Sequence, residues 1–316
     1  MTHAQQRPPW GHMDALVQGM MRSRPIPEAW RPTTAGNAEQ QWQQWLDSLI
    51  SDLESMLWPT YDFSKGTWSR PPNPALMDAD FQLMELLKSQ LDEPIRGRAA
   101  VETKHRVLFD EEDDDYLLFG HKYERYDPGL PQYLRDGLTH ILWNGYDRKL
   151  GSLHLQLKHV FQRPRAYQVA LLQNRTFEHL RSRLAATPSL VSGHCLQASL
   201  AGVSAFVLFG TSVDFASLAV LRQFTVDIGD RRVFAGVHYP SDNLSSWYTA
   251  LQLLPHVVDN SVLPSTRAFL WEAISSQSAV YQAIRAHVDT NPKSPYREAV
   301  AAIEAAAQGS TDGGVR

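Results

Sequence analysis

The chain has 316 residues, of which 43% are hydrophobic and 20% charged, a composition typical of ordered globular proteins and not of disordered ones. Its formal net charge of −4 gives no general electrostatic attraction to nucleic acid, so no nucleic-acid partner is expected. The single cysteine, Cys195, excludes an intramolecular disulfide and a zinc site built from several thiolates.

The N-terminal part of the chain combines an arm with two helical patterns. Residues 1–36 are rich in Pro, Arg and Gly and predict an extended arm without a secretory signal, so a cytoplasmic location is the default expectation. Apolar residues recur at helical spacing over 39–58 and 75–91, and the stretch 61–74 between them is interpreted as a loop. Both helices are interpreted as packing elements. The Trp-rich helix over 39–58 leaves a homodimer open.

An acidic run over 110–115 follows these helices. Its carboxylates would suit Mg²⁺ or Ca²⁺, but the spacing and central glycine of an EF-hand loop are absent. A solvated acidic loop is the favoured interpretation, and no metal site is predicted. The sequence leaves the role of this run open.

The rest of the chain is dominated by helical patterns, over 133–146, 150–162, 265–288 and 294–308, and alternating strand patterns are scarce. The chain is therefore predicted to be an all-α protein, a helical bundle. The uncharged run from Cys195 to Val213 is barely long enough to span a membrane. Its Gln, Ser, Thr and Gly residues favour a buried helix, so no membrane span is expected.

Three short segments carry polar residues that suit an anion. The first, KHVFQRPR over 158–165, places Lys158 and Arg165 at the end of an apolar helix. Lysine offers a point charge and arginine a planar fork, a combination that suits a tetrahedral oxyanion. Taken alone, the segment is better explained as basic residues that complement a helix dipole.

The second segment, Ser192-Gly193-His194, precedes the apolar run. Serine is a good N-cap and glycine allows close backbone approach, so the first N–H groups of the helix make a ready anion site. His194 is placed to donate a proton to that anion. Taken alone, an ordinary serine cap beside a satisfied histidine is the simpler interpretation.

The third segment, RRVFAGVHYPSDN over 231–243, places Asp242 four residues after His238, and Pro240 is well placed to begin a helix. If Asp242 accepts a hydrogen bond from Nδ1–H of His238, Nε2 is left as a nucleophile. Arg232 adds another cation. The alternative is a loop histidine beside an aspartate that caps a helix.

Together the three segments predict one anion cage with groups for proton transfer and nucleophilic attack. A net acidic protein has little reason to bury three cations unless an anion joins them, and this set of groups suits phosphoryl transfer. Its members are Lys158, Arg165, Ser192, Gly193, His194, Arg232, His238 and Asp242.

The same residues resemble the signature of the type 2 phosphatidic acid phosphatase (PAP2) superfamily, which includes bacterial acid phosphatases and vanadium-dependent haloperoxidases. That signature is Lys, six residues, Arg-Pro; then Pro-Ser-Gly-His; then Ser-Arg, five residues, His, three residues, Asp. The chain follows it in order from Lys158 to Asp242, with Ala166, Val191 and Arg231 in place of Pro, Pro and Ser. None of these departures removes a group that the chemistry needs.

The resemblance implies a helical bundle of the PAP2/haloperoxidase type with additional N-terminal helices. In this interpretation residues 1–130 form an arm and helices packed on the core. Residues 131–255 form the catalytic core, and residues 256–316 form C-terminal helices that complete the bundle.

The resemblance also implies two chemistries in one cage. In the phosphatases the residue matching His238 attacks phosphorus to form a phosphohistidine, and the residue matching His194 protonates the leaving oxygen, without a cofactor. In the haloperoxidases the equivalent of His238 ligates vanadate, and bound peroxide oxidises halide. The short stretches from Arg165 to Ser192 and from His194 to Arg232 favour the phosphatases, with a small phosphorylated substrate. A non-catalytic anion-binding scaffold is the third alternative.

Overall fold

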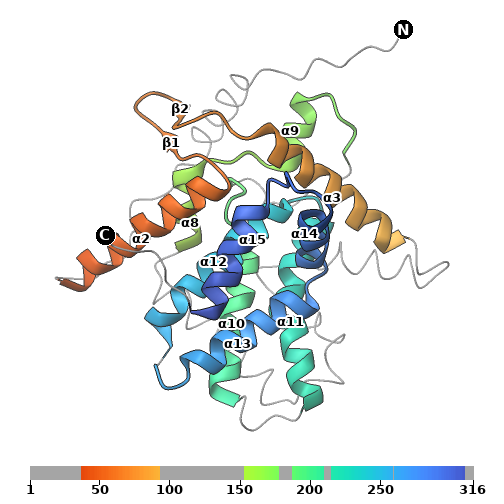
Figure 1. Ribbon diagram of the computed structural model, residues 1–316. Coiled ribbons are helices and arrows are strands. Elements are labelled where there is room, and N and C mark those ends of the chain that lie inside the picture. The colour runs from red at the N-terminus through yellow and green to blue at the C-terminus, as the bar shows by residue number, and fades with distance from the viewer. Residues whose placement is uncertain (1–36, 93–152, 178–186, 210–214, 259, 310–316) are drawn as a thin grey trace.

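In the computed structural model the chain forms a bundle of helices with one small hairpin (Figure 1). The structure describes residues 37–92, 153–177, 187–209, 215–258 and 260–309. The all-α class predicted from the sequence is confirmed. The elements are α2 (Asn37–Met56), β1 (Tyr61–Asp62), β2 (Thr67–Trp68), α3 (Pro74–Asp92), α8 (Leu153–Phe161), α9 (Ala166–Leu172), α10 (Gly193–Phe209), α11 (Phe215–Phe234), α12 (Pro240–Val257), α13 (Leu263–Gln277), α14 (Ala279–Thr290) and α15 (Arg297–Gln308).

The centre of the bundle is formed by α10, α11, α12 and α13, which pack on one another, and α15 lies against α12. Helices α10 and α11 approach each other closely because Gly202 faces Thr225. A Cβ atom at position 202 would lie 2.0 Å from the Thr225 hydroxyl oxygen. The predicted apolar run is therefore a core helix up to Phe209, where its described part ends. None of the helices in the described ranges is long and apolar enough to cross a membrane.

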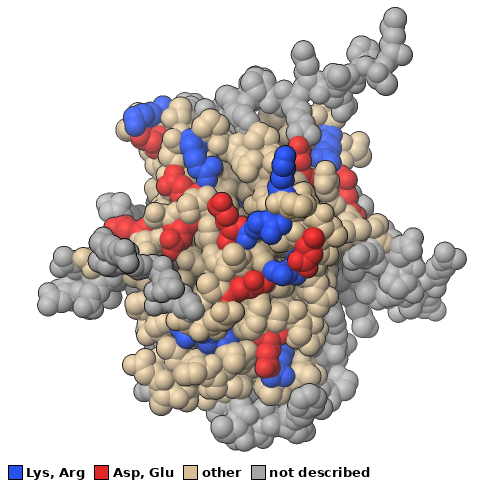
Figure 2. Space-filling model, viewed as in Figure 1, with Lys and Arg blue, Asp and Glu red and all other residues tan. Residues whose placement is uncertain are grey.

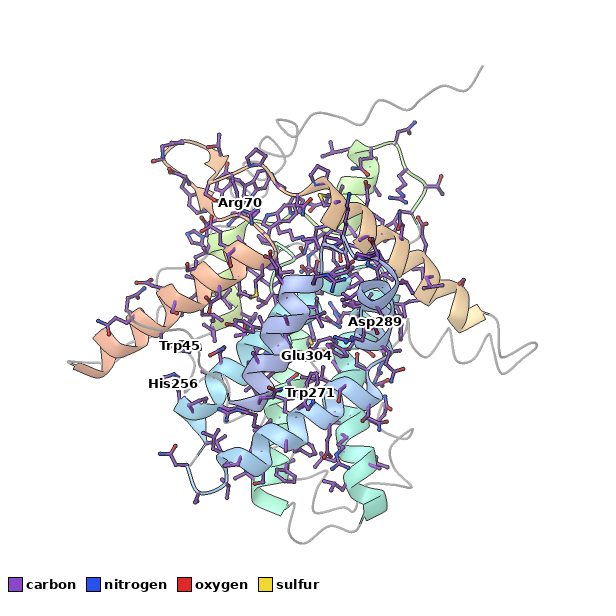
Figure 3. All side chains as sticks on the ribbon, viewed as in Figure 1. Trp45, Arg70, His256, Trp271, Asp289 and Glu304 are labelled. Atoms are coloured by element: carbon purple, nitrogen blue, oxygen red, sulfur yellow. The ribbon has the colours of Figure 1, made fainter. Side chains whose placement is uncertain are left out.

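The two predicted N-terminal helices are confirmed as α2 and α3, and they extend toward opposite sides of the bundle (Figure 1). The apolar face of α2 packs on the bundle through Leu46, Leu49 and Leu53, which are buried. Trp45 lies beside His256 at the end of α12, with ring centroids 5.3 Å apart (Figure 3). The described part of the apolar face of α2 therefore packs against the same chain, and the homodimer stays a prediction.

The stretch 61–74, expected to be a loop, contains a short antiparallel hairpin in which Tyr61 pairs with Trp68. The Asp62 side chain accepts a hydrogen bond from the backbone N–H of Ser64 (2.9 Å), and Gly66 adopts a φ of 71°, which glycine allows without strain. The Trp68 indole donates to the Phe161 carbonyl oxygen (3.0 Å), which fixes the hairpin on the end of α8. Strands of two residues are too short to give an alternating pattern.

The C-terminal pattern over 265–288 forms two helices, α13 and α14, which are separated at Ser278. Its hydroxyl accepts a hydrogen bond from the Tyr281 N–H and donates one to Asp230 of α11, so the start of α14 is capped. On the face shown in Figure 2, Lys and Arg side chains are interspersed with Asp and Glu. The arm over 1–36, the acidic run over 110–115 and the predicted helix over 133–146 lie outside the described residues.

Replacing Gly202 with alanine is expected to force α10 and α11 apart and to lower the free energy of unfolding by about 1–3 kcal/mol. Chemical denaturation of the full chain measures the effect. Thr225→Ala removes the obstructing hydroxyl and methyl, so the double variant should regain part of the loss. Equal stability of Gly202→Ala and the unsubstituted chain would contradict the proposed close contact.

Candidate active site

The predicted site lies where α8 and α11 end and where α10 and α12 begin. Lys158 is buried in the last turn of α8, and its Nζ donates hydrogen bonds to the carbonyl oxygens of Pro188 and of Ser189, the latter at 3.1 Å. Burial and the charge of Arg165 hold the pKa of Lys158 well below its usual value. Lys158 thus connects α8 with the segment that leads into α10.

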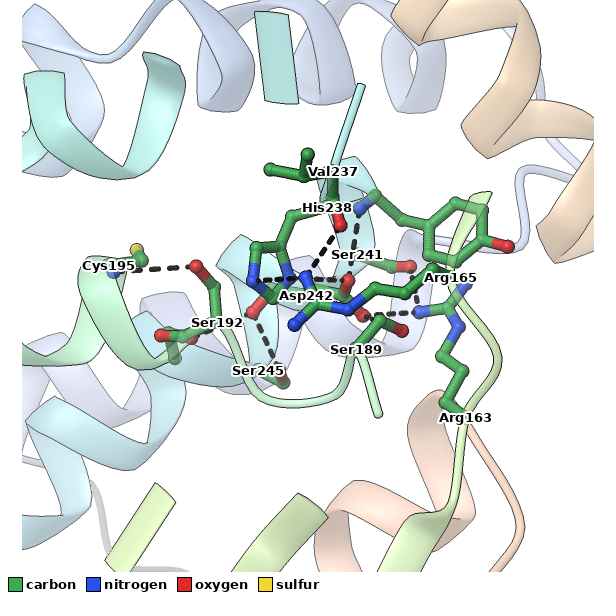
Figure 4. A network of polar contacts seen from close by, with 12 residues as sticks. Arg163, Arg165, Ser189, Ser192, Cys195, Val237, His238, Ser241, Asp242 and Ser245 are labelled. Atoms are coloured by element: carbon green, nitrogen blue, oxygen red, sulfur yellow. Dashed lines mark hydrogen bonds and ion pairs between the residues drawn. The ribbon is translucent and has the colours of Figure 1, made fainter. Parts of the chain in front are cut away.

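Arg165 points its guanidinium at the predicted nucleophile (Figure 4). Its Nε donates to the carbonyl oxygen of Thr187 and its Nη1 to that of Val237, both at 2.7 Å. The same Nη1 lies 2.9 Å from Nε2 of His238. Two backbone carbonyls therefore fix the orientation of a buried cation against one imidazole nitrogen. Burial lowers the pKa of Arg165 to about 10.

Ser192 caps α10, as the sequence predicted. Its hydroxyl oxygen accepts a hydrogen bond from the backbone N–H of Cys195 (3.4 Å), and its own N–H donates to the Asp242 carbonyl oxygen (3.5 Å). Gly193 and His194 form the first turn. The helix N-terminus therefore lies against the start of α12, with His194 close enough for its charge to lower the pKa of His238.

His238 and Asp242 are in contact at the start of α12, which begins at Pro240 as predicted. Nδ1 of His238 lies 2.9 Å from Oδ2 of Asp242, and the same oxygen accepts a hydrogen bond from the Tyr239 N–H (3.0 Å). Because an ionised carboxylate only accepts, Nδ1 carries the proton and Nε2 holds the lone pair. This nitrogen is the one that faces Arg165.

A glycine turn brings His238 to this position. Helix α11 ends near Gly236, whose φ of 75° is the left-handed conformation common after helix ends. The N–H groups of Val237 and His238 then both donate to the Arg232 carbonyl oxygen at 3.2 Å. The Arg232 side chain is buried, and burial lowers its pKa to about 9.

Basic side chains surround a neutral His238. The pKa of His238 is held well below its usual value, first by burial and then by the charges of Arg165, Lys158 and Arg232. Buried cations at close range repel one another, and a shared oxyanion would relieve that repulsion. In the described ranges no group of three or more His, Cys, Asp or Glu residues could hold a metal ion.

Comparison with known proteins finds one family. Residues 149–259 match the model of the PAP2 superfamily, a stretch that contains the segments around Lys158, Ser192 and His238. The similarity to the PAP2 superfamily is shown for this segment. None of the curated proteins and none of the solved structures matches the chain. The match supports an activity of the phosphatase or haloperoxidase type.

The three departures from the PAP2 signature have local explanations. Ala166 is buried and begins α9, directly after Arg165. Val191 is buried in the core. Arg231 pairs with Asp227 one turn earlier on α11 (3.0 Å), so its Nε points at that carboxylate. The contact between Arg165 and His238 is present alongside these departures.

Sequence reasoning missed two charged residues of this site, Arg163 and Asp80. Arg163 donates to Oδ1 of Asp242 (2.8 Å) and to Oδ2 of Asp80 on α3 (2.7 Å), and all three side chains are fully buried. A signal for Asp80 was present, because it lies on the apolar face of its helix together with Leu76, Leu83 and Met84. A carboxylate in that position needs a buried partner.

A third histidine, His154, was also missed. It lies one turn before Lys158 on α8, and a Cβ atom at Gly193 would lie 2.8 Å from its ring. Burial and the charges of Lys158 and His194 lower the pKa of His154 from 6.5 to about 3. The glycine of the PAP2 signature therefore makes room here for a neutral imidazole.

Arg165→Gln is expected to weaken the binding of inorganic phosphate and of vanadate by about 10- to 100-fold, because it removes a charge-assisted donor from the cage. Isothermal titration calorimetry of the full chain measures both affinities. Arg285→Gln is the matched control, since Arg285 pairs with Glu304 on the partly exposed face of α14. Equal affinities in the two variants would rule out the anion cage.

Stability should fall as the pH drops from about 6.5 toward 3, because the unfolded chain then binds a proton that folded His154 does not. His154→Gln lacks this contribution and should show a flatter decline of unfolding free energy across that window. Denaturation at a series of pH values tests the slope. Parallel curves for the two proteins would show that His154 is not held neutral by the fold.

Proposed function

We propose that the chain hydrolyses phosphomonoesters through a phosphohistidine formed on Nε2 of His238. The observation that carries the proposal is the pair of contacts on one imidazole. Asp242 holds Nδ1 at 2.9 Å, and the Arg165 guanidinium faces Nε2 at 2.9 Å. Nucleophilic histidines need this arrangement, an oriented and neutral ring with cations beside the nitrogen that attacks.

Substrate binding uses the positive cluster. A phosphoryl group brings negative charge to Lys158, Arg165 and Arg232, whose burial has removed most competing water. When substrate binds, Arg165 replaces its contact with Nε2 by a contact with a phosphoryl oxygen. The lone pair of Nε2 is then available to phosphorus. The first N–H groups of α10 and the Ser192 hydroxyl supply further donors.

The reaction then proceeds in two displacements. Nε2 of His238 forms a bond to phosphorus, the ester P–O bond breaks, and protonated His194 gives its proton to the leaving oxygen. Water attacks phosphorus next, its proton goes to His194, and the P–N bond breaks to release phosphate. Throughout, Asp242 accepts the Nδ1–H hydrogen bond and stabilises the positive charge that the phosphorylated ring carries.

A vanadium-dependent haloperoxidase is the second candidate, because the same donors fit vanadate. Vanadate matches phosphate in charge and shape, so Lys158, Arg165 and Arg232 would bind its oxygens and Nε2 of His238 would be its ligand. Bound vanadate would supply activation of peroxide toward halide. The short stretches between the signature segments support the phosphatase, as does the orientation of Nε2 toward a cation.

His238→Ala is expected to lower phosphate release from an aryl phosphate by at least about a thousandfold, because it removes the nucleophile. The assay uses the full chain with no added metal. His256→Ala is the control, since His256 contacts Trp45 away from the site and should leave the rate unchanged. Full activity of His238→Ala would contradict the proposed mechanism.

Two assays on the same preparation distinguish the phosphatase from the haloperoxidase. Phosphate release without bromination of a dye in the presence of vanadate, peroxide and bromide supports the phosphatase. Bromination without phosphate release supports the haloperoxidase. If both assays are silent while phosphate still binds, the chain is an anion-binding scaffold.

A further inference from the structure

Arg163 lies between two carboxylates that come from different parts of the chain. Its Nη1 donates to Oδ1 of Asp242 at 2.8 Å and its Nη2 to Oδ2 of Asp80 at 2.7 Å. The guanidinium carbon lies 4.0 Å from the ring centroid of Tyr239 and 4.6 Å from that of Trp58. Asp80 belongs to α3, outside the segment that matches the PAP2 superfamily. An N-terminal helix therefore reaches the residues that hold the predicted nucleophile.

Asp80 is surrounded by donors. Its Oδ1 accepts from the Ser241 N–H (3.0 Å) and the Tyr296 hydroxyl (2.9 Å), and its Oδ2 accepts from Arg163 and the Ser241 hydroxyl (2.6 Å). Burial raises the pKa of Asp80, and the charge of Arg163 and the hydrogen bond from Ser241 oppose that rise. Because each of these four contacts donates to it, the ionised carboxylate is the form that fits.

The charge of Asp80 matters because Arg163 serves both carboxylates. With Arg163 as its only charged partner at Oδ1, Asp242 would have much of its negative charge offset. A second carboxylate on the same guanidinium reduces the extent to which Arg163 offsets the charge of Asp242. Both ion pairs of Arg163 are strong because all three groups are buried. Asp242 then keeps more negative charge for the Nδ1–H group of His238.

We propose that Asp80 is a positioning residue for the PAP2 site, which balances the charge of Arg163 and so strengthens the contact of Asp242 with His238. Asp80 touches neither the substrate nor the reacting atoms and acts through Arg163. The consequence for the rate rests on the proposed function, in which His238 becomes positively charged. The strength of the Asp242–His238 hydrogen bond does not depend on that function and can be measured by itself.

Several charged groups, Asp242 among them, act on His238, and the effect of Asp80 on the Asp242–His238 contact adds to theirs. They are Asp242 of α12, Lys158 of α8, Arg165 before α9, His194 of α10 and Arg232 of α11. The four basic groups disfavour a positive charge on the ring, and Asp242 opposes them. A change in the strength of Asp242 as an acceptor should therefore have a measurable effect on His238.

The test is Asp80→Asn in the full chain, which removes the charge and keeps the shape. The Nδ1–H proton resonance of His238, assigned by its loss in His238→Gln, is expected to move upfield because its acceptor is weaker. In phosphatase assays kcat should fall about tenfold while KM stays within about twofold, since no group that contacts substrate changes.

Two further variants separate charge from structure. Tyr296→Phe removes one donor to the same carboxylate and keeps the charge, so the resonance and kcat should match those of the unsubstituted chain. In the double variant Asp80→Asn/Arg163→Met both charges are gone and the Met side chain fills the space between Trp58 and Tyr239. Asp242 then keeps its charge for His238, and the resonance and kcat should return toward the original values.

The outcomes are distinct. An unchanged resonance in folded Asp80→Asn overturns the proposal, and so does a double variant as impaired as the single one. If Asp80→Asn does not fold, as judged by circular dichroism, the double variant is measured alone. A resonance and a kcat that differ from those of the unsubstituted chain then overturn the proposal. If neither folds, Asp80 serves only stability and the proposal is overturned. Absence of phosphatase activity in every chain, with the resonance shifts as expected, refutes the proposed function alone.

Discussion

The carboxylate of Asp242 accepts hydrogen bonds from opposite sides of the site, from His238 at one oxygen and from Arg163 at the other. It has no exposed surface, so water does not compete for either oxygen. The tautomer of His238 and the direction of its Nε2 depend on this one group, and Arg163 links it to Asp80 of α3. Arg165, a buried cation, lies at the other side of the imidazole, beside Nε2.

Much of the fold could be predicted from periodicity, because α2, α3 and α10 each carry a long apolar pattern and α12 begins at a proline. The hairpin could not, since two residues per strand give no alternation and its position depends on a hydrogen bond from Trp68 to a distant carbonyl. The division at Ser278 depends likewise on Asp230 of α11, a contact between residues far apart in sequence. Local pattern does not contain such tertiary contacts.

The contact between His238 and Asp242 was predictable because it is local, at a spacing of four residues across the start of a helix. Arg163 and Asp80 were harder to predict, since they are 83 residues apart in the sequence and meet only in the folded protein. The position of Asp80 on the apolar face of its helix was the feature of the sequence that indicated a buried partner. The roles assigned to Lys158, His194 and Arg232 stay predictions, supported by their charges near His238.

The most direct test of the central claim is to identify the phosphorylated residue during turnover. Base-quenched reactions of the full chain with an aryl phosphate, followed by peptide mass spectrometry, would locate the phosphoryl group. The account predicts a phosphorylated peptide that contains His238, with modification at the imidazole and with formation and decay fast enough for turnover. A phosphoryl group on His194, or rapid phosphate release with no modified histidine at any time, would contradict it.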